Sequence, residues 1–288
     1  MSYDSLSPII IVGAGRSGTK MLRAALNSHP DVVCFPTEIN YIWRYGNAKL
    51  DTDELTPKHA RPEVVRYIRC QFNKLSKKFH SGIIVEKTCA NSLRVDFVHT
   101  ILPKARIVHL VRDGRAVAES ARRCWKGQLS VNYLLKKACW VPPRDIPHYA
   151  FRYIRYQLGR FNRHDTKQTS WGPRFVRLDD LVREKSLVEV CGIQWKVCVQ
   201  AAESALRHLP SLQVTTVRYE DIVKFPLGTI EELFDKLNLT FTESCQDYLR
   251  QNISASNLDK WKDKLSQEDL ILLLPHIETE LQQHGYEI

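Results

Sequence analysis

The chain has 288 residues, 43% of them hydrophobic, which is enough for one sizeable domain with a buried core. Lysine and arginine (42) outnumber aspartate and glutamate (32), and the formal net charge of +10 indicates an anionic ligand, a nucleic acid or an acidic surface as partner. No apolar run approaches the roughly 20 residues of a membrane-spanning helix, so we expect no transmembrane helix.

The eight cysteines are scattered along the chain and form no C-x-x-C pair. This spacing favours buried, reduced thiols over disulfides or metal ligands. The first residues lack a basic segment followed by an apolar one, so we expect no signal peptide and a cytoplasmic protein.

The first predicted element is a short buried strand over residues 9–12, followed by a glycine-containing turn and a helix. Such a turn aims backbone N–H groups and a helix N-terminus at one point, which makes an anion site. Gly13 and Gly18 fit the P-loop pattern G-x-x-x-x-G-K-[ST], but Thr19 and Lys20 then stand in the reverse order. We therefore expect a site for a phosphate-like group other than ATP with Mg²⁺.

A second strand is expected over residues 32–35, and Glu38 lies just past its end. Parallel sheets bind ligands at the carboxyl ends of their strands, so this carboxylate is a candidate general base. From this segment alone, a solvated glutamate or an ion-pair partner is the more ordinary interpretation. A helix is expected over residues 62–77.

A third strand, over residues 83–88, carries Lys87 near its end, and a crossover helix is expected over residues 91–102. A lysine in this position can meet a bound anion, although a lysine that snorkels from the sheet edge is the alternative. The fourth strand covers residues 106–112. His109, in the middle of that strand, is expected to be a core histidine.

Arg112 stands at the tip of the fourth strand, and Asp113 is expected to cap the helix behind it. Ser120 lies inside that helix, where it and Arg112 can converge on one anion. Three strand-to-helix units in succession predict a doubly wound parallel sheet. Arg112 would then lie on the same edge of the sheet as Lys87 and as Arg16 in the first turn. These are three cationic residues, each following a different strand.

A strongly basic segment occupies the middle of the chain. Between residues 122 and 177, thirteen lysines and arginines are opposed only by two aspartates, so this segment carries +11, and aromatic residues are interleaved with the charges. The pattern indicates an anionic acceptor or a sugar stacked on aromatic rings; a solvated basic helix, expected over residues 149–161, explains it equally well. A nucleic-acid role would leave the strand-end residues unexplained.

The C-terminal part is expected to be mostly scaffold. We predict a helix over 187–209, a strand over 214–219, a helix over 226–237, and a final helix that Ser266 caps, Pro275 kinks and Gly285 ends.

The turn and the strand ends together resemble the sulfotransferase superfamily, whose donor is 3′-phosphoadenosine 5′-phosphosulfate. In that family the loop G-x-x-R-S-G-T-T holds the 5′-phosphosulfate; here residues 13–20 differ from it by a lysine in the last position. The resemblance implies that Arg112 and Ser120 bind the 3′-phosphate. It implies donor contacts from six residues of the loop: Gly15, Arg16, Ser17, Gly18, Thr19 and Lys20.

The motifs are most similar to those of bacterial and tyrosylprotein-type members. Residues 112–116 read Arg-Asp-Gly-Arg-Ala, the usual form there. A tail similar to the tyrosylprotein type implies that Lys260 closes over the donor phosphates. Tyr219 falls at another family strand end, near the donor.

One departure from the family decides the expected base. Small-molecule members have Lys-Thr-His after the second strand, with that histidine as the base, but this chain has Lys87, Thr88 and Cys89. A thiol differs from imidazole in proton affinity and reach. In the glycan and tyrosylprotein types the base is a glutamate, and Glu38 matches its position.

We therefore predict an α/β fold, a P-loop-like doubly wound parallel sheet flanked by helices with a helical basic insertion. The chain would form a single sulfotransferase-like domain over residues 1–288. Its core would cover about 8–125 and 190–288, and the acceptor-side insertion about 126–180.

The implied reaction is sulfuryl transfer to an acceptor hydroxyl by in-line displacement, leaving 3′-phosphoadenosine 5′-phosphate. Glu38 would take the proton, while Lys87 and Arg16 would stabilise the transferred group and the leaving oxygen. No metal is expected, since these cations replace Mg²⁺. The acceptor would be a glycan or glycolipid hydroxyl, or alternatively a tyrosine in an acidic peptide.

Two other classes of protein stay open at this point. One is an NTP-dependent P-loop kinase, and the other is a non-catalytic binder of nucleotide or polyanion. We expect no nucleic-acid partner; the basic segment could contact a membrane surface.

Overall fold

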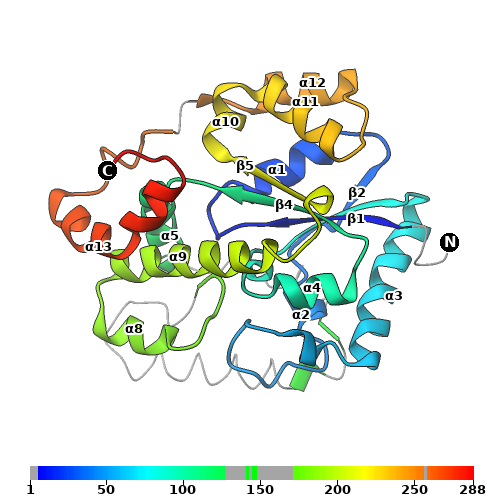
Figure 1. The fold of residues 1–288 in the computed structure, drawn as a ribbon, viewed down its shortest axis with the longest axis horizontal. Helices are drawn as coiled ribbons and strands as arrows, with labels where there is room; N and C mark the ends of the chain where they lie inside the picture. Colours follow the sequence, from blue (N-terminus) through cyan, green and yellow to red (C-terminus); the bar gives the residue numbers. More distant parts are fainter. Residues whose placement is uncertain (1–5, 127–140, 143–144, 148–170, 256–257) are drawn as a thin grey trace.

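The computed structural model describes residues 6–126, 141–142, 145–147, 171–255 and 258–288. Its centre is a sheet of five parallel strands in the order β2-β3-β1-β4-β5, which confirms the predicted doubly wound α/β class (Figure 1). The strands are β1 (Ser7–Val12), β2 (Val32–Cys34), β3 (Ile83–Lys87), β4 (Arg106–Val111) and β5 (Val214–Arg218).

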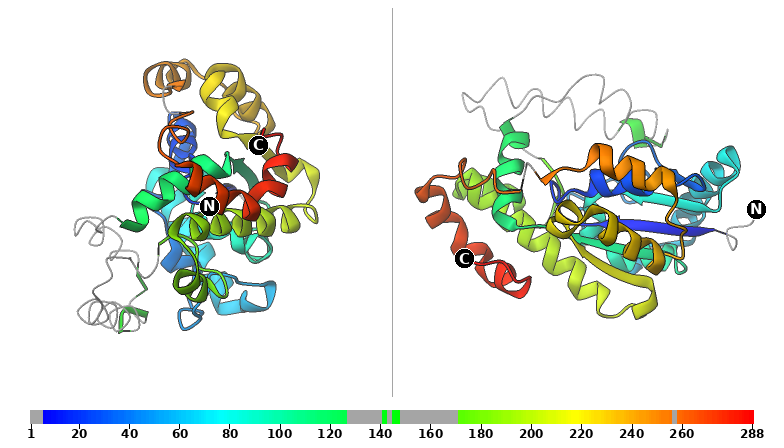
Figure 2. Two further views of the ribbon diagram at one scale, coloured as in Figure 1. Left: turned by 90° about the vertical axis from the view of Figure 1, so that its left-hand side faces the viewer. Right: turned by 90° about the horizontal axis from the view of Figure 1, so that it is seen from above.

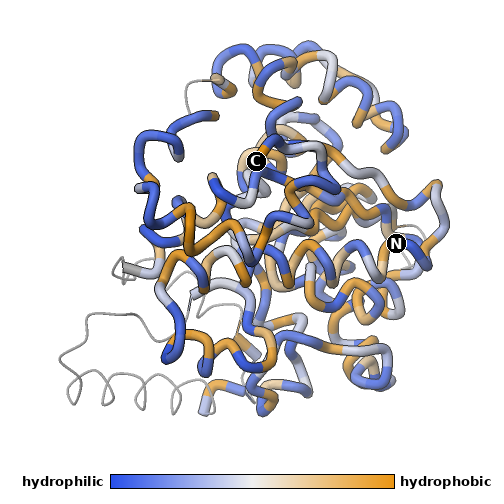
Figure 3. The backbone as a smooth tube through the Cα atoms, turned by 60° about the vertical axis from the view of Figure 1, so that its left-hand side comes forward, coloured by the Kyte–Doolittle hydropathy of each residue, from blue (hydrophilic) through white to orange (hydrophobic). Residues whose placement is uncertain are grey.

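The middle strand β1 is apolar because both of its faces are covered. Ile9 and Ile11 pack against one layer of helices, and Ile10 and Val12 pack against the other, all with no exposed surface. A run of β-branched residues without polar alternation is the pattern expected of such a strand. In Figure 3, hydrophobic stretches of the chain lie mostly inside the fold and hydrophilic ones mostly toward its outside.

Helices cover the two faces of the sheet and its carboxyl end (Figures 1 and 2). One face carries α1 (Thr19–Leu26), α10 (Tyr219–Lys224), α11 (Pro226–Lys236) and α12 (Glu243–Asn252). The other carries α2 (Asn40–Trp43), α3 (Pro62–Phe79) and α4 (Val95–Ile101). A third apolar cluster joins α5 (Gly114–Lys126), α8 (Leu178–Glu184), α9 (Leu187–Leu206) and α13 (Gln267–Gln283).

The order of the strands fixes where a ligand can bind. From β1 the chain passes to α1 and the β2 side of the sheet, whereas from the neighbouring β4 it passes to α5, which packs on α9. Connections that leave adjacent strands in opposite directions open a crevice at the carboxyl ends of those strands. The turn after β1 and Arg112 after β4 therefore lie at the switch point of the sheet.

The structure corrects one predicted helix. Residues 91–102 are not continuous, because a 3₁₀ turn (Cys89–Leu93) and α4 are separated at Arg94, whose φ is −151°. Arg94 is 2% exposed and its guanidinium donates to Asn91 and Asn40, so the polar contacts of this buried side chain interrupt the helix. Two other short 3₁₀ helices are Pro57–His59 and Ser211–Gln213.

The predicted C-terminal helices and strand are present, with small differences at their ends. Ser266 caps α13 in a capping box, Pro275 lies inside that helix, and Gly285 follows it with a φ of +70°. The predicted helix over 149–161, and most of the insertion predicted over 126–180, lie outside the described residues. In the described parts of the chain, every cysteine is a free thiol, and no helix has the length and apolarity needed to cross a bilayer.

Candidate functional site

The turn between β1 and α1 is held in a shape that only glycine allows at its last position. Gly18 has a φ of +92°, and a Cβ there would lie 2.3 Å from the ring of Tyr219. Arg16 is also in the left-handed region, at φ +76°, and the Ser17 N–H donates to Ala14 O over 3.1 Å. A left-handed backbone in this turn leads directly into the first turn of α1.

The N-terminus of α1 is suited to an anion. Its cap residue, Gly18, offers no side chain, and no side-chain group caps the first turn. The Ser17 hydroxyl is buried without a hydrogen-bond partner, while Lys20 is exposed on the first turn. Uncapped N–H groups, the helix dipole and a nearby ammonium together favour negative charge at this end.

Arg16 joins the turn to α5. Its Nε donates to the Ser120 hydroxyl over 2.9 Å, across 104 positions of sequence. Arg112 Nη1 donates to the Arg16 carbonyl over 3.0 Å, and the Arg112 guanidinium lies 4.1 Å from the centre of the Tyr219 ring. The structure therefore brings Arg112 and Ser120 together through Arg16.

Arg112 is itself held by the scaffold. Its carbonyl accepts a hydrogen bond from the Trp195 indole over 3.1 Å, and Asp113 caps α5 by accepting from the Arg115 N–H over 2.8 Å. The predicted cap at Asp113 is thus confirmed. The Nε of Arg112 is buried and has no partner, so this guanidinium has a donor left for a bound group.

The second part of the site is an ion pair between the ends of β2 and β3. Lys87 Nζ and Glu38 Oε1 lie 2.5 Å apart, and the side chains are 9% and 26% exposed. Burial pulls the pKa of Lys87 down, but Cys89 and the Glu38 carboxylate outweigh it and hold that pKa above its ordinary value. Lys87 is therefore a fixed cation, and Glu38 keeps access to solvent.

Cys89 connects the two parts of the site. Its sulfur lies 3.7 Å from Lys87 Nζ and 3.6 Å from the Thr19 hydroxyl at the start of α1. Burial raises the pKa of this thiol to about 11, against the lowering effect of Lys87. A protonated, buried thiol is a poor proton acceptor near neutral pH.

The remaining predicted site residues are Gly15, which belongs to the turn, and Lys260, which lies in the C-terminal part of the chain. Gly15 faces Trp171, whose ring would lie 3.0 Å from an added Cβ. Lys260 is exposed, and its neighbour Trp261 lies under the Arg115 guanidinium at 4.4 Å, beside the start of α5. The role of Lys260 in the donor site stays a prediction.

Two carboxylates near the site, the buried Glu86 and the half-buried Glu220, were not predicted. Glu86 has no exposed surface, and burial raises its pKa to about 7. Glu220 accepts from the Asp113 N–H and from the Tyr286 hydroxyl, so it ties α5 to the C-terminal tail. A glutamate inside an otherwise apolar strand was the available signal for Glu86; no local pattern marks Glu220.

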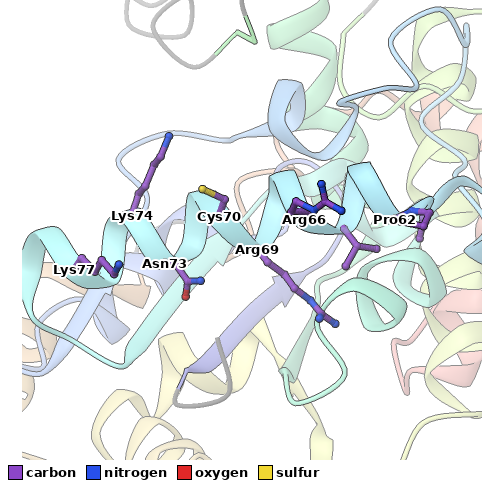
Figure 4. A pocket seen from close by; sticks show the side chains of 9 residues that line it. Pro62, Arg66, Arg69, Cys70, Asn73, Lys74 and Lys77 are labelled. Carbon is purple, nitrogen blue, oxygen red and sulfur yellow. The ribbon is translucent and has the colours of Figure 1, made fainter. Parts of the chain in front are cut away.

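A surface groove lies away from these residues, along α3 (Figure 4). Arg66, Arg69, Lys74 and Lys77 line it, and none of the predicted site residues does. Among the described residues, no group of histidine, cysteine, aspartate and glutamate is arranged to hold a metal ion.

The stretch that carries most of the site residues matches a known family model. A model described as the sulfotransferase family matches residues 8–139, which include the turn, Glu38, Lys87, Arg112 and Ser120. No curated protein sequence matches the chain.

Several solved structures share the fold over nearly the whole chain. The sulfotransferase domain from the curacin biosynthetic pathway is 17% identical, with a TM-score of 0.60 over 98% of this chain and 99% of that one. Sulfotransferase STF9 from Mycobacterium avium is 12% identical, with a TM-score of 0.56 over 99% of this chain and 78% of that one. Mouse sulfotransferase SULT7A1, complexed with PAP, is 13% identical, with a TM-score of 0.50 over 98% of this chain and 88% of that one. Since these identities are low, they establish the fold alone, and the match to the sulfotransferase family model adds the family's motifs over residues 8–139, somewhat less than half of the chain.

Proposed function

We propose that the protein transfers a sulfuryl group from 3′-phosphoadenosine 5′-phosphosulfate to an acceptor hydroxyl, with Glu38 as the base. The observation that carries this proposal is the ion pair between Glu38 and Lys87, which Cys89 connects to the first residue of α1. A carboxylate, a fixed ammonium and an anion-binding turn in one contact network are the groups that in-line transfer of a charged group needs.

The residues of the turn fit the donor. Ser17 and Arg112 each have a buried polar atom without a partner, and the N-terminus of α1 has no side-chain cap. We assign the 5′-phosphosulfate to residues 15–20 and the 3′-phosphate to Arg112 and Ser120. The mouse neighbour, solved with PAP, supports the same donor class.

Glu38 and Lys87 act as a coupled pair in this proposal. The acceptor oxygen attacks sulfur while the bond from sulfur to the bridging phosphate oxygen breaks, and the hydroxyl proton moves to Glu38. A protonated Glu38 attracts Lys87 less strongly, so the ammonium is released toward the charge that grows on the leaving oxygen. Arg16, held by Ser120, adds a second fixed cation.

For the acceptor we propose a glycan or glycolipid hydroxyl. The net charge of +10 supports an anionic acceptor. The free thiols of the described cysteines are in keeping with a cytoplasmic location, which stays a prediction.

Calorimetry tests the donor. We expect 3′-phosphoadenosine 5′-phosphate to bind tightly with or without Mg²⁺, and ATP to bind weakly in both conditions. A preference for ATP with Mg²⁺ would favour a kinase, and binding of neither nucleotide would favour a polyanion binder.

Substitution tests the base. Glu38→Gln should keep affinity for 3′-phosphoadenosine 5′-phosphate but lower turnover by roughly 10²–10⁴-fold, the usual contribution of a general base. Glu63→Gln, which changes an exposed glutamate paired with Arg61 on α3, is the matched control and should leave turnover unchanged. Wild-type turnover in Glu38→Gln would mean that another group is the base.

A further inference from the structure

The loop that carries Glu38 is fastened to β3 at a second point. The Ile39 N–H donates to the Thr88 hydroxyl over 3.1 Å, and both residues are buried. Thr88 directly follows Lys87 in the chain. The end of β3 therefore contacts the loop twice, through the Lys87 side chain to Glu38 and through the Thr88 side chain to the next backbone amide.

The direction of the Thr88 hydroxyl is fixed by Glu86. The single hydroxyl proton of Thr88 goes to Glu86 Oε1, 2.5 Å away. The ionised form of Glu86, which prevails above its pKa of about 7, only accepts, and a threonine hydroxyl has one proton to give. With that proton committed to Glu86, the oxygen lone pairs of Thr88 are left for the Ile39 N–H.

Glu86 is in turn fixed on its other side. Its Oε2 accepts from Asn91 Nδ2 over 2.9 Å, and Asn91 Oδ1 accepts from Arg94 Nε over 2.8 Å. All three residues are at most 2% exposed, so water does not compete for these bonds. Alternation along β3 sends Glu86 to the face of the sheet opposite Lys87. The chain of bonds thus holds the loop from behind, away from the donor.

We propose that Thr88, oriented by Glu86, is a positioning residue that holds Glu38 in place against Lys87. This inference rests on the proposed function in one respect, the role of Glu38 as the base. Thr88 touches neither the turn nor Arg112 in any described contact, so its effect on turnover passes through the Ile39 amide and the loop.

The test compares Thr88→Val with Thr88→Ser. Valine keeps the shape but removes the hydroxyl, whereas serine keeps the hydroxyl and removes a methyl group. Hydrogen exchange at the Ile39 amide should be about 10-fold faster in Thr88→Val, which corresponds to the loss of a bond worth about 1.4 kcal/mol, and close to wild type in Thr88→Ser. Thr229→Val removes a half-buried hydroxyl on α11 and is the matched control.

Turnover is measured as release of 3′-phosphoadenosine 5′-phosphate from the donor, with water as acceptor. Thr88→Val should lower kcat by about 10–100-fold, because a displacement near 1 Å at a reacting group costs that much. Calorimetric affinity for 3′-phosphoadenosine 5′-phosphate should stay within about twofold of wild type, and Thr88→Ser should restore kcat.

The outcomes separate this inference from the proposed function. If Thr88→Val keeps the Ile39 protection, or loses nucleotide affinity as much as kcat, the positioning role is overturned whatever Glu38 does. If Glu38→Gln is inactive while Thr88→Val matches Thr88→Ser in kcat, the base stands and the positioning role fails. If Glu38→Gln retains wild-type kcat, the base assignment fails, and with it the catalytic part of the positioning role.

Discussion

Arg112 is the residue whose contacts most directly predict discrimination between nucleotides. It stacks on Tyr219 and donates to the Arg16 carbonyl, and its Nε has no partner. We expect Arg112→Ala to weaken binding of 3′-phosphoadenosine 5′-phosphate by about 10–100-fold, since a hydrogen bond to a charged group contributes roughly 1.5–3 kcal/mol. Adenosine 5′-phosphate, which lacks the 3′-phosphate, should lose less than about threefold, as measured by calorimetry.

The same pair of nucleotides provides the control for that substitution. If Arg112→Ala weakened binding of both nucleotides equally, the guanidinium would be supporting the turn rather than contacting the 3′-phosphate. Ser120→Ala should show the same selectivity with a smaller loss, because its hydroxyl is neutral and also accepts from Arg16.

Glu86 predicts a pH dependence of stability. Burial raises its pKa from 4.5 to about 7, against hydrogen bonding from Thr88 and the charge of Arg94. The folded state therefore binds a proton more tightly than the unfolded chain, so ionised Glu86 costs stability above pH 7 and that cost disappears as the pH falls toward 4.5. Between pH 8 and 5, wild type should gain unfolding free energy relative to Glu86→Gln, up to an amount on the order of 3 kcal/mol.

Urea unfolding of both proteins at several pH values measures this difference. Arg94 and Arg44 hold the pKa of Asp53 below its ordinary value despite the burial of this carboxyl. Asp53 is present in both proteins, so its contribution cancels in the difference between their unfolding free energies. Parallel stability curves between pH 5 and 8 would contradict the assignment of a raised pKa to Glu86.

At the scale of the element, the turn before α1 depends on Gly18. Its φ of +92° is strained for any other residue, and a Cβ would lie 2.3 Å from the Tyr219 ring. We expect Gly18→Ala to lower the unfolding free energy by about 2–4 kcal/mol through strain and overpacking, and to weaken nucleotide binding as the turn moves. Thermal unfolding and calorimetry measure the two effects.

Gly228 in α11 is the matched control for this substitution. Apart from its chain neighbours and the backbone of its own helix, no atom lies within 4 Å of an added Cβ there, and its φ is not in the left-handed region. Gly228→Ala should therefore stabilise the helix by up to about 1 kcal/mol and leave nucleotide binding unchanged. If Gly18→Ala also stabilised the protein and left nucleotide binding unchanged, the contact with Tyr219 would not be what excludes a side chain at position 18.

The strands and their ends were predictable from sequence because their signals are local. Apolar runs marked β1, β3 and β4, and the residues after them lie at the carboxyl edge in a parallel sheet. The division of the helix at Arg94 was not predictable, because its cause is a set of buried contacts to Asn40 and Asn91, the first of them 54 positions away. Propensity alone favoured a continuous helix.

At the scale of the whole molecule, the site is assembled from contacts that sequence patterns do not carry. Arg16 and Ser120 are 104 positions apart, and Lys87 and Glu38 are 49 apart. Residue types at strand ends predicted which groups would gather there. Their pairing depends on side-chain directions that only the folded chain defines: Ser120 contacts Arg16, and Arg112 contacts the backbone of the turn.

The net charge of the molecule makes a prediction about the acceptor. With a charge of +10 and the excess concentrated between residues 122 and 177, the protein should attract an anionic acceptor over a distance that salt shortens. The screening length falls from about 30 Å at 0.01 M salt to about 8 Å at 0.15 M. The KM for a carboxylated or sulfated glycan should therefore rise several-fold between these concentrations, whereas the KM for a neutral glycan should change less than about twofold. Initial rates at saturating donor measure both constants, and equal salt dependence for the two acceptors would mean that the basic segment does not face the acceptor.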